Sequence, residues 1–131
     1  MKFKYKNYGQ GILRPVIPIE ISYKHLTVPY EALVDSGADF CIFSAQIGEI
    51  LEIDIEKGDR FEVRGITGKS EYYYVHPVTI KVGGWSYNIK AGFMPNIGAF
   101  SYGVVGQKGF FDIFKVKFDL SKEVVELAEI K

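Results

Sequence analysis

The 131-residue sequence is poor in cysteine and histidine, with one Cys and two His, and this scarcity excludes several classes of protein. A single cysteine, Cys41, excludes a disulfide within the chain and is compatible with a reducing compartment. His25, His76 and Cys41 share none of the spacings that mark zinc sites. We therefore expect no metal site and no cofactor, and we interpret all three as ordinary strand or turn residues.

Long apolar runs and an excess of charge of one sign are also missing. No apolar run in the sequence reaches the ~18 residues of a membrane span, and the N-terminus lacks the apolar stretch of a secretory signal. Sixteen basic residues balance sixteen acidic ones, so no net field attracts nucleic acid or an anionic membrane. We expect a cytoplasmic protein with neither nucleic acid nor membrane among its partners.

Hydrophobic residues make up 47% of the chain and aromatic residues 15%, which suits a globular protein built from strands. The length fits one domain spanning residues 1–131. Apolar and polar residues alternate over 15–23, 26–34 and 85–93, with Gly83-Gly84 as a hairpin turn before the last of these. About eight to ten short strands and two short helices, one after Ser44 and one near Gln107, predict an all-β sandwich or barrel-like fold.

The stretch from Ala32 to Phe43 stands out, because an acidic Asp35-Ser36-Gly37 turn sits between two apolar runs. Both runs look apolar on both faces, as expected of buried strands. A carboxylate carried into such a setting loses solvation, and buried charges are rare unless they are paired or functional. A solvated turn acid is the better interpretation of an isolated Asp-Ser-Gly, but here the context favours function for Asp35.

Two other motifs lack the context that their chemistry requires. Gly68-Lys69-Ser70 resembles the end of a phosphate-binding loop, but Val63 stands where that loop needs a glycine and a strand follows instead of a helix. No Gly-x-Ser-x-Gly elbow of a serine hydrolase occurs.

The sequence 33–39, Leu-Val-Asp-Ser-Gly-Ala-Asp, resembles the active-site loop of retropepsin-like aspartic proteases, the retroviral-type half-size relatives of pepsin. Three further features follow in the order of that family. A glycine-bounded tip at Gly65 to Gly68 resembles the flap that closes over substrate, and Val104-Val105-Gly106 resembles the apolar-apolar-Gly segment. A C-terminal strand pair completes a resemblance that covers roughly residues 17–127.

This resemblance implies an all-β, single retropepsin-like closed β-barrel or sandwich domain with one or two short helices. It implies an aspartic endopeptidase that acts on a peptide or protein substrate as a homodimer, because each chain supplies one catalytic Asp. The catalytic residues implied are Asp35, Ser36 and Gly37. The substrate-binding residues implied are Ala38, Asp39, Gly65, Ile66, Thr67 and Gly68.

Two departures from the family pattern stand in the sequence. Ser36 replaces a common threonine and keeps its hydroxyl. Gln107 stands where retroviral members carry an arginine that pairs with the acid matching Asp39, which leaves the strength of the dimer and the role of Asp39 open. Leu33-Val34-Asp35-Ser36-Gly37 and Val104-Val105-Gly106 also resemble each other, since each is an apolar pair that ends a strand before a sharp turn. A repeated strand–turn unit and coincidence both explain this likeness.

Three alternatives remain open at this stage. A catalytically inactive domain of the same fold would bind peptides or partner proteins through an open sheet edge. A self-processing fragment of a larger polyprotein is a second possibility, mildly disfavoured by Met1. The tip at Gly65 to Gly68 has a plain surface hairpin as its alternative.

Overall fold

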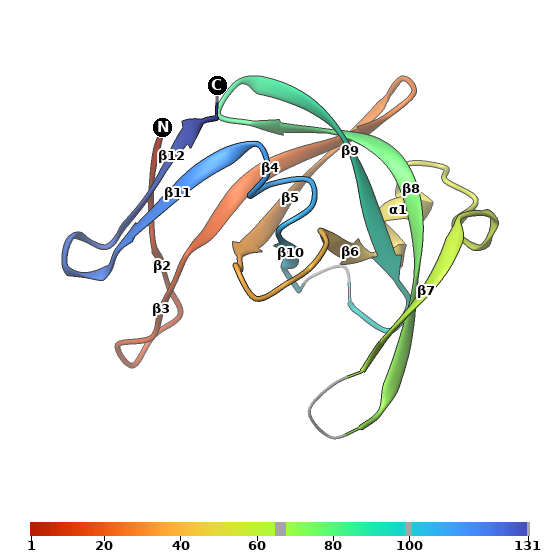
Figure 1. The fold of residues 1–131 in the computed structure, drawn as a ribbon, viewed down its shortest axis with the longest axis horizontal. Helices are drawn as coiled ribbons and strands as arrows, with labels where there is room; N and C mark the ends of the chain where they lie inside the picture. Colours follow the sequence, from red (N-terminus) through yellow and green to blue (C-terminus); the bar gives the residue numbers. More distant parts are fainter. Residues whose placement is uncertain (65–67, 99–100, 131) are drawn as a thin grey trace.

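The computed structural model describes residues 1–64, 68–98 and 101–130, which form a strand-rich fold (Figure 1). The strands within this part of the chain are β1 (Lys2–Lys4), β2 (Lys6–Asn7), β3 (Leu13–Arg14), β4 (Val16–Tyr23), β5 (Leu26–Val34), β6 (Ile42–Ser44), β7 (Asp59–Arg64), β8 (Ser70–Val82), β9 (Trp85–Met94), β10 (Gly103–Val105), β11 (Phe114–Asp119) and β12 (Val124–Glu129). One helix, α1 (Ala45–Ile50), and two 3-10 turns, η1 (Ile55–Lys57) and η2 (Leu120–Lys122), accompany them.

The expected closed barrel is confirmed. Six strands pair in the order β4-β5-β10-β6-β9-β8, and β8 pairs back onto β4 to close the ring. Ile21 and Ile80 face each other at this closure and both are fully buried. β7 continues the sheet as a hairpin with β8, while β1, β12 and β11 form a separate three-stranded sheet.

Alternation along most of each barrel strand places one set of side chains in the core. In β4, Ile17, Ile19 and Ile21 are buried and Pro18 is exposed, as the period of two predicts. Pro18 also lies outside Glu20–Ser22, the part of β4 that pairs with β8. The absence of an N–H group on Pro18 therefore costs no hydrogen bond between these two strands. Burying each large apolar side chain in this core stabilises the fold by roughly 1.5–3 kcal/mol.

One of the two expected helices is present among the described residues. Ser44 caps α1 as predicted, because its hydroxyl oxygen accepts a hydrogen bond from Gln46 N at 3.2 Å. The helix expected near Gln107 is wrong, since residues 107 and 109–113 form turns and Lys108 pairs with Phe40 in an isolated β-bridge. Gly109 adopts φ +102° there, and its N–H donates to Asp112 Oδ1 at 3.0 Å, which interrupts helical geometry. The Phe110 and Phe114 rings still reach the core and pack 5.1 Å apart.

Parallel pairing of β5 with β10 brings the two echoing segments of the sequence side by side. Leu33 lies opposite Val104, and Val34 lies opposite Val105. The turns that follow these strands touch at Gly106, where an added Cβ would lie 2.5 Å from the Ala38 carbonyl oxygen and 2.6 Å from that of Phe40. Only glycine fits at so close a backbone approach.

No α-helix in the described part of the chain is long and apolar enough to cross a membrane.

We predict that the Cys41 thiol does not react in the native protein. Cys41 is fully buried, and burial raises the pKa of its thiol from 9.0 to about 12. A raised pKa keeps the thiol neutral at pH 8, and the thiolate is the reactive form. Ellman's reagent at pH 8 should therefore label the protein only after guanidinium is added. Stoichiometric labelling of native protein at the rate of a free thiol would contradict this packing.

We predict that Gly106→Ala destabilises the protein by about 1–3 kcal/mol, because the new methyl group meets backbone atoms that side-chain rotation cannot move. Urea unfolding measures the change. Gly98→Ala is the matched control, since its nearest added contact is Ser101 Oγ at 3.9 Å, and its effect should stay within about 0.5 kcal/mol. Equal stability of the two variants would count against the close approach.

Candidate active site

Asp35 follows β5 directly and begins a tight turn that lies at the centre of the view in Figure 1. Its backbone N–H donates to Val105 O at 3.1 Å, so the neighbouring parallel strand holds it in place. Its carbonyl oxygen accepts a hydrogen bond from Ala38 N at 3.2 Å, which closes the turn. Its side chain is half-buried, whereas Ser36 and Gly37 are exposed. The loop thus presents its acid at the surface of the barrel.

The carboxylate of Asp35 is bonded within its own loop. Its Oδ1 accepts a hydrogen bond from Gly37 N at 2.9 Å. A Cβ at Gly37 would lie 3.2 Å from the same oxygen, so glycine allows this approach. An N–H group that donates to a carboxylate makes a charge-assisted hydrogen bond, which is stronger than a neutral one. The loop therefore fixes the orientation of its acid.

The face on which Asp35 lies is apolar but not part of the core. Leu33, Val104 and Ile42 form a row across β5, β10 and β6, and all three are half-buried. Their neighbours Val34, Val105 and Phe43 point to the opposite face and are 3%, 0% and 0% exposed. The sequence predicted that the runs on either side of the turn are buried strands, but the structure shows that they are buried on one face only. They look apolar on both faces because one face packs the core and the other forms an open floor beside Asp35.

An aromatic wall stands at the end of this floor, where the β7–β8 hairpin approaches the loop. Phe61 of β7 stacks on Tyr73 of β8 at 5.8 Å, and both rings lie about 6 Å from Phe40, which follows the loop. Gly92 makes room for this packing, because a Cβ there would meet the Tyr73 ring and, at 2.9 Å, Ile42 Cδ1. A groove of about 550 Å³ opens beside Phe40 and Phe61.

Asp39 is exposed, and its charge reaches this wall. Burial raises the pKa of the Tyr73 hydroxyl above its ordinary value of 10.0, and the negative charge of Asp39 raises it further. The Tyr73 hydroxyl therefore stays protonated at neutral pH. The backbone carbonyl of Asp39 accepts a hydrogen bond from Lys108 N at 2.9 Å. The 35–39 loop and the β7–β8 hairpin therefore interact through the charge of Asp39 as well as through the ring contacts of Phe40.

Gln107 bonds to the loop in a different way from the expected family arginine. Its side-chain Nε2 donates to the Ser36 carbonyl oxygen at 3.0 Å, and its backbone N donates to Ala38 O at 2.8 Å. Its amide is directed at the backbone of the loop, and no bond from it to the Asp39 carboxylate occurs in the described residues. The segment after β10 therefore holds the loop through neutral hydrogen bonds.

The expected flap falls partly outside the described residues. Gly65, Ile66 and Thr67 are not described, while Gly68 is exposed with φ +81°. β7 and β8 are paired from Asp59–Val75 to Arg64–Ser70, so the hairpin that carries the tip is formed. In Figure 1 it extends from the barrel on the same side as the Asp35 loop.

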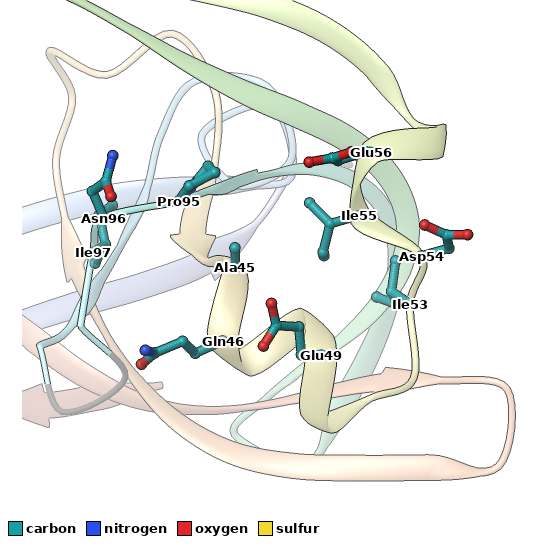
Figure 2. Close-up of a pocket in the computed structure, with 10 residues that line it drawn as sticks. All are labelled: Ala45, Gln46, Glu49, Ile53, Asp54, Ile55, Glu56, Pro95, Asn96 and Ile97. Carbon is teal, nitrogen blue, oxygen red and sulfur yellow. The ribbon is translucent and has the colours of Figure 1, made fainter.

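A second groove lies elsewhere, between α1, η1 and the segment after β9 (Figure 2). Its volume is about 520 Å³, and carboxylates of Glu49, Asp54 and Glu56 surround an apolar floor. Asp54 lies 3.5 Å from Lys57 Nζ in an exposed ion pair. No residue of the 35–39 loop lines this groove. Among the described residues, no group of three or more His, Cys, Asp or Glu side chains is arranged to hold a metal ion.

Sequence reasoning placed Asp35 at a strand end but missed much of its surroundings. Leu33, Ile42 and Val104 carry no individual signal, because their shared row depends on strand pairing. Tyr73 joins the wall with 5% of its surface exposed, whereas Phe93 is fully buried in the core. The only signal in the sequence for these surroundings was the likeness of Val104-Val105-Gly106 to the segment that carries Asp35, and the two segments are in fact paired in parallel.

Comparisons with known proteins agree with this architecture. The family model described as aspartyl protease matches residues 19–108. A retropepsin-like aspartic protease from Rickettsia conorii superimposes with a TM-score of 0.64 at 15% identity, covering 95% of this chain and 97% of that one. EIAV protease complexed with the inhibitor HBY-793 gives 0.53 at 20% identity, covering 78% of this chain and 88% of the other.

A search of curated protein sequences gives no significant match. The two solved structures are similar in fold, and the family model spans the barrel strands from β4 through β10 together with the Asp35 loop. The chain therefore belongs to the aspartyl protease family and has a retropepsin-like fold.

Proposed function

We propose that two copies of this chain form a symmetric homodimer that hydrolyses peptide bonds as an aspartic endopeptidase. The observation that carries the proposal is the half-buried Asp35 carboxylate, oriented by Gly37 N–H and set beside an open apolar floor. Membership of the aspartyl protease family supports peptidase chemistry.

The chemistry requires a second acid, which a twofold axis supplies. Peptide hydrolysis needs one group to take a proton from water and another to give one to the substrate. Each chain offers one oriented acid at the floor, because Asp39 lies exposed beyond the turn. A C2 dimer places the same surface of each copy against the other, and so brings two Asp35 residues together. Ser36 and Gly37 would then brace one loop against its partner.

The paired carboxyl groups share one proton, as in other aspartic proteases, because two carboxylates held about 3 Å apart cannot both ionise. The ionised Asp35 takes a proton from water while the water oxygen bonds to the scissile carbonyl carbon. The protonated Asp35 of the other chain gives its proton to the carbonyl oxygen. In the second step the amide nitrogen is protonated by one carboxyl group, the C–N bond breaks, and the other takes back the diol proton.

Substrate would lie extended across the row of Leu33, Val104 and Ile42, which favours apolar side chains next to the scissile bond. Ala38 and Asp39 would contact the peptide backbone from the loop. Gly65, Ile66, Thr67 and Gly68 would cover it from the hairpin tip. These assignments rest on the family resemblance and on the position of the floor.

We predict that Asp35→Asn abolishes peptide cleavage, because an amide can neither take the proton from water nor share one with its partner. Cleavage of a peptide library at several pH values measures this. Wild-type activity should be highest at mildly acid pH and fall above neutrality, where both carboxyl groups ionise.

The matched control is Asp54→Asn, which removes an exposed carboxylate in the groove away from the loop. It should cleave like the wild type. Cleavage that persists in Asp35→Asn would refute the assignment. Peptide binding without cleavage in the wild type would instead support the catalytically inactive binding domain.

We predict that Gly68→Ala slows turnover if the tip acts as a flap. Gly68 has φ +81° and open space around it, so alanine adds only backbone strain, about 1 kcal/mol. Gly9→Ala is the control, since Gly9 has φ +88° and equally open space on the β2–β3 hairpin. Both variants should lose similar stability, and only Gly68→Ala should lose turnover. Equal turnover in the two would favour a plain surface hairpin.

A further inference from the structure

The Ser36–Gly37 peptide group is hydrogen-bonded at both of its ends. Gln107 Nε2 donates to its carbonyl oxygen at 3.0 Å, and its N–H donates to Asp35 Oδ1 at 2.9 Å. We propose that Gln107 is a positioning residue that orients the Asp35 carboxylate through this peptide group. The inference rests on the proposed function, because it assigns a role in the reaction of the same site.

Planarity makes the peptide group a rigid connection. All described peptide bonds are trans, so the carbonyl oxygen and the N–H of this group point in opposite directions within one plane. A bond that fixes the oxygen of Ser36 therefore fixes the direction in which Gly37 N–H points. Without it, the plane at the exposed apex of the loop can turn about its flanking dihedrals.

The two hydrogen bonds also strengthen each other. A donor at the carbonyl oxygen polarises the peptide group and makes its N–H a better donor, so bonds in such a chain are cooperative. The final acceptor is the carboxylate that takes the proton from water in the proposed reaction. Gln107 thus acts on the charge of Asp35 without touching it.

The backbone around Gln107 is fixed to the same loop, which makes its reach well defined. Gln107 N donates to Ala38 O at 2.8 Å, and Lys108 N donates to Asp39 O at 2.9 Å. Within the described residues, Gln107 is the only residue outside the 35–39 loop whose side chain forms a hydrogen bond with it. The amide is uncharged, so the Gln107 side chain itself does not titrate.

Three substitutions at this one position test the proposal. Gln107→Leu removes the donor and keeps the size. Gln107→Arg keeps a donor and serves as the conservative rescue. In Gln107→Glu, the side chain is a carboxylate at pH values above the ordinary glutamate pKa of about 4.3, and it then cannot donate to the Ser36 carbonyl. At pH values below that pKa it is a carboxyl group that can donate.

We expect Gln107→Leu to lower kcat by about 3- to 10-fold, the equivalent of one hydrogen bond, with KM unchanged within about twofold. Gln107→Arg should recover most of this loss. Gln107→Glu should match or exceed the loss at pH 6 and recover relative to wild type at pH 4. Gln10→Leu, at an exposed glutamine on the β2–β3 hairpin, is the matched control and should leave kcat unchanged.

The amide resonance of Gly37 in NMR spectra gives a readout that needs no catalysis. Its proton shift and exchange rate should move in Gln107→Leu, and in Gln107→Glu they should approach wild type as the pH falls. No change of either quantity in Gln107→Leu would overturn the proposal, as would a kcat loss in Gln107→Glu that is the same at both pH values.

This readout also separates the inference from the proposed function. If Asp35→Asn still cleaves while the Gly37 amide responds to Gln107 variants, the proposed function fails and the hydrogen-bond connection stands. If Asp35→Asn is inactive and the Gly37 amide resonance does not change in the Gln107 variants, the proposed role of Gln107 is wrong and the proposed function stands. Should Gln107→Leu unfold, the comparison of Gln107→Glu with itself at two pH values decides the matter.

Discussion

The close backbone contact between the 35–39 loop and the segment after β10 is the constraint on which the site depends. Gly106 permits it, and hydrogen bonds from Gln107 and Lys108 to successive loop carbonyls maintain it. Both partners are themselves fixed, because they continue from strands β5 and β10 that pair in parallel. The position of Asp35 is therefore set by the barrel and not by the loop alone. This explains how an exposed turn can hold an acid in one orientation.

The barrel serves two purposes with opposite faces of the same three strands. Val34, Val105 and Phe43 fill the core, and the residues beside them in sequence form the floor next to Asp35. Apolar residues on both faces would be unusual for a surface strand, since exposed apolar surface has a cost in water. In the function proposed above, this floor receives an extended peptide, which gives these residues a reason to remain partly open. The wall of Phe40, Phe61 and Tyr73 bounds it on the hairpin side.

The sequence predicted the strand pattern well, because burial on one face imposes a period of two that β4 and β5 display. It failed near Gln107, where the spacing of Phe110 and Phe114 looked helical but Gly109 and Asp112 form turns. The position of Asp35 was predictable from sequence, because it lies in a recognisable Asp-Ser-Gly motif. The bond from Gln107 to Ser36 was not, because it joins residues 71 positions apart and depends on a register that no local pattern encodes. The strand pairing behind the floor was hidden for the same reason.

That long separation along the chain has a consequence for how the protein folds. Hairpins such as β8–β9 close locally, but β5 and β10 meet only after a large loop has been ordered, which carries an entropic cost that grows with its length. Topologies rich in such distant pairings fold slowly. The acid and its supports come together only when β5 and β10 pair. A chain that had formed only its local hairpins would therefore still lack the assembled loop, so the proposed cleavage depends on the β5–β10 pairing.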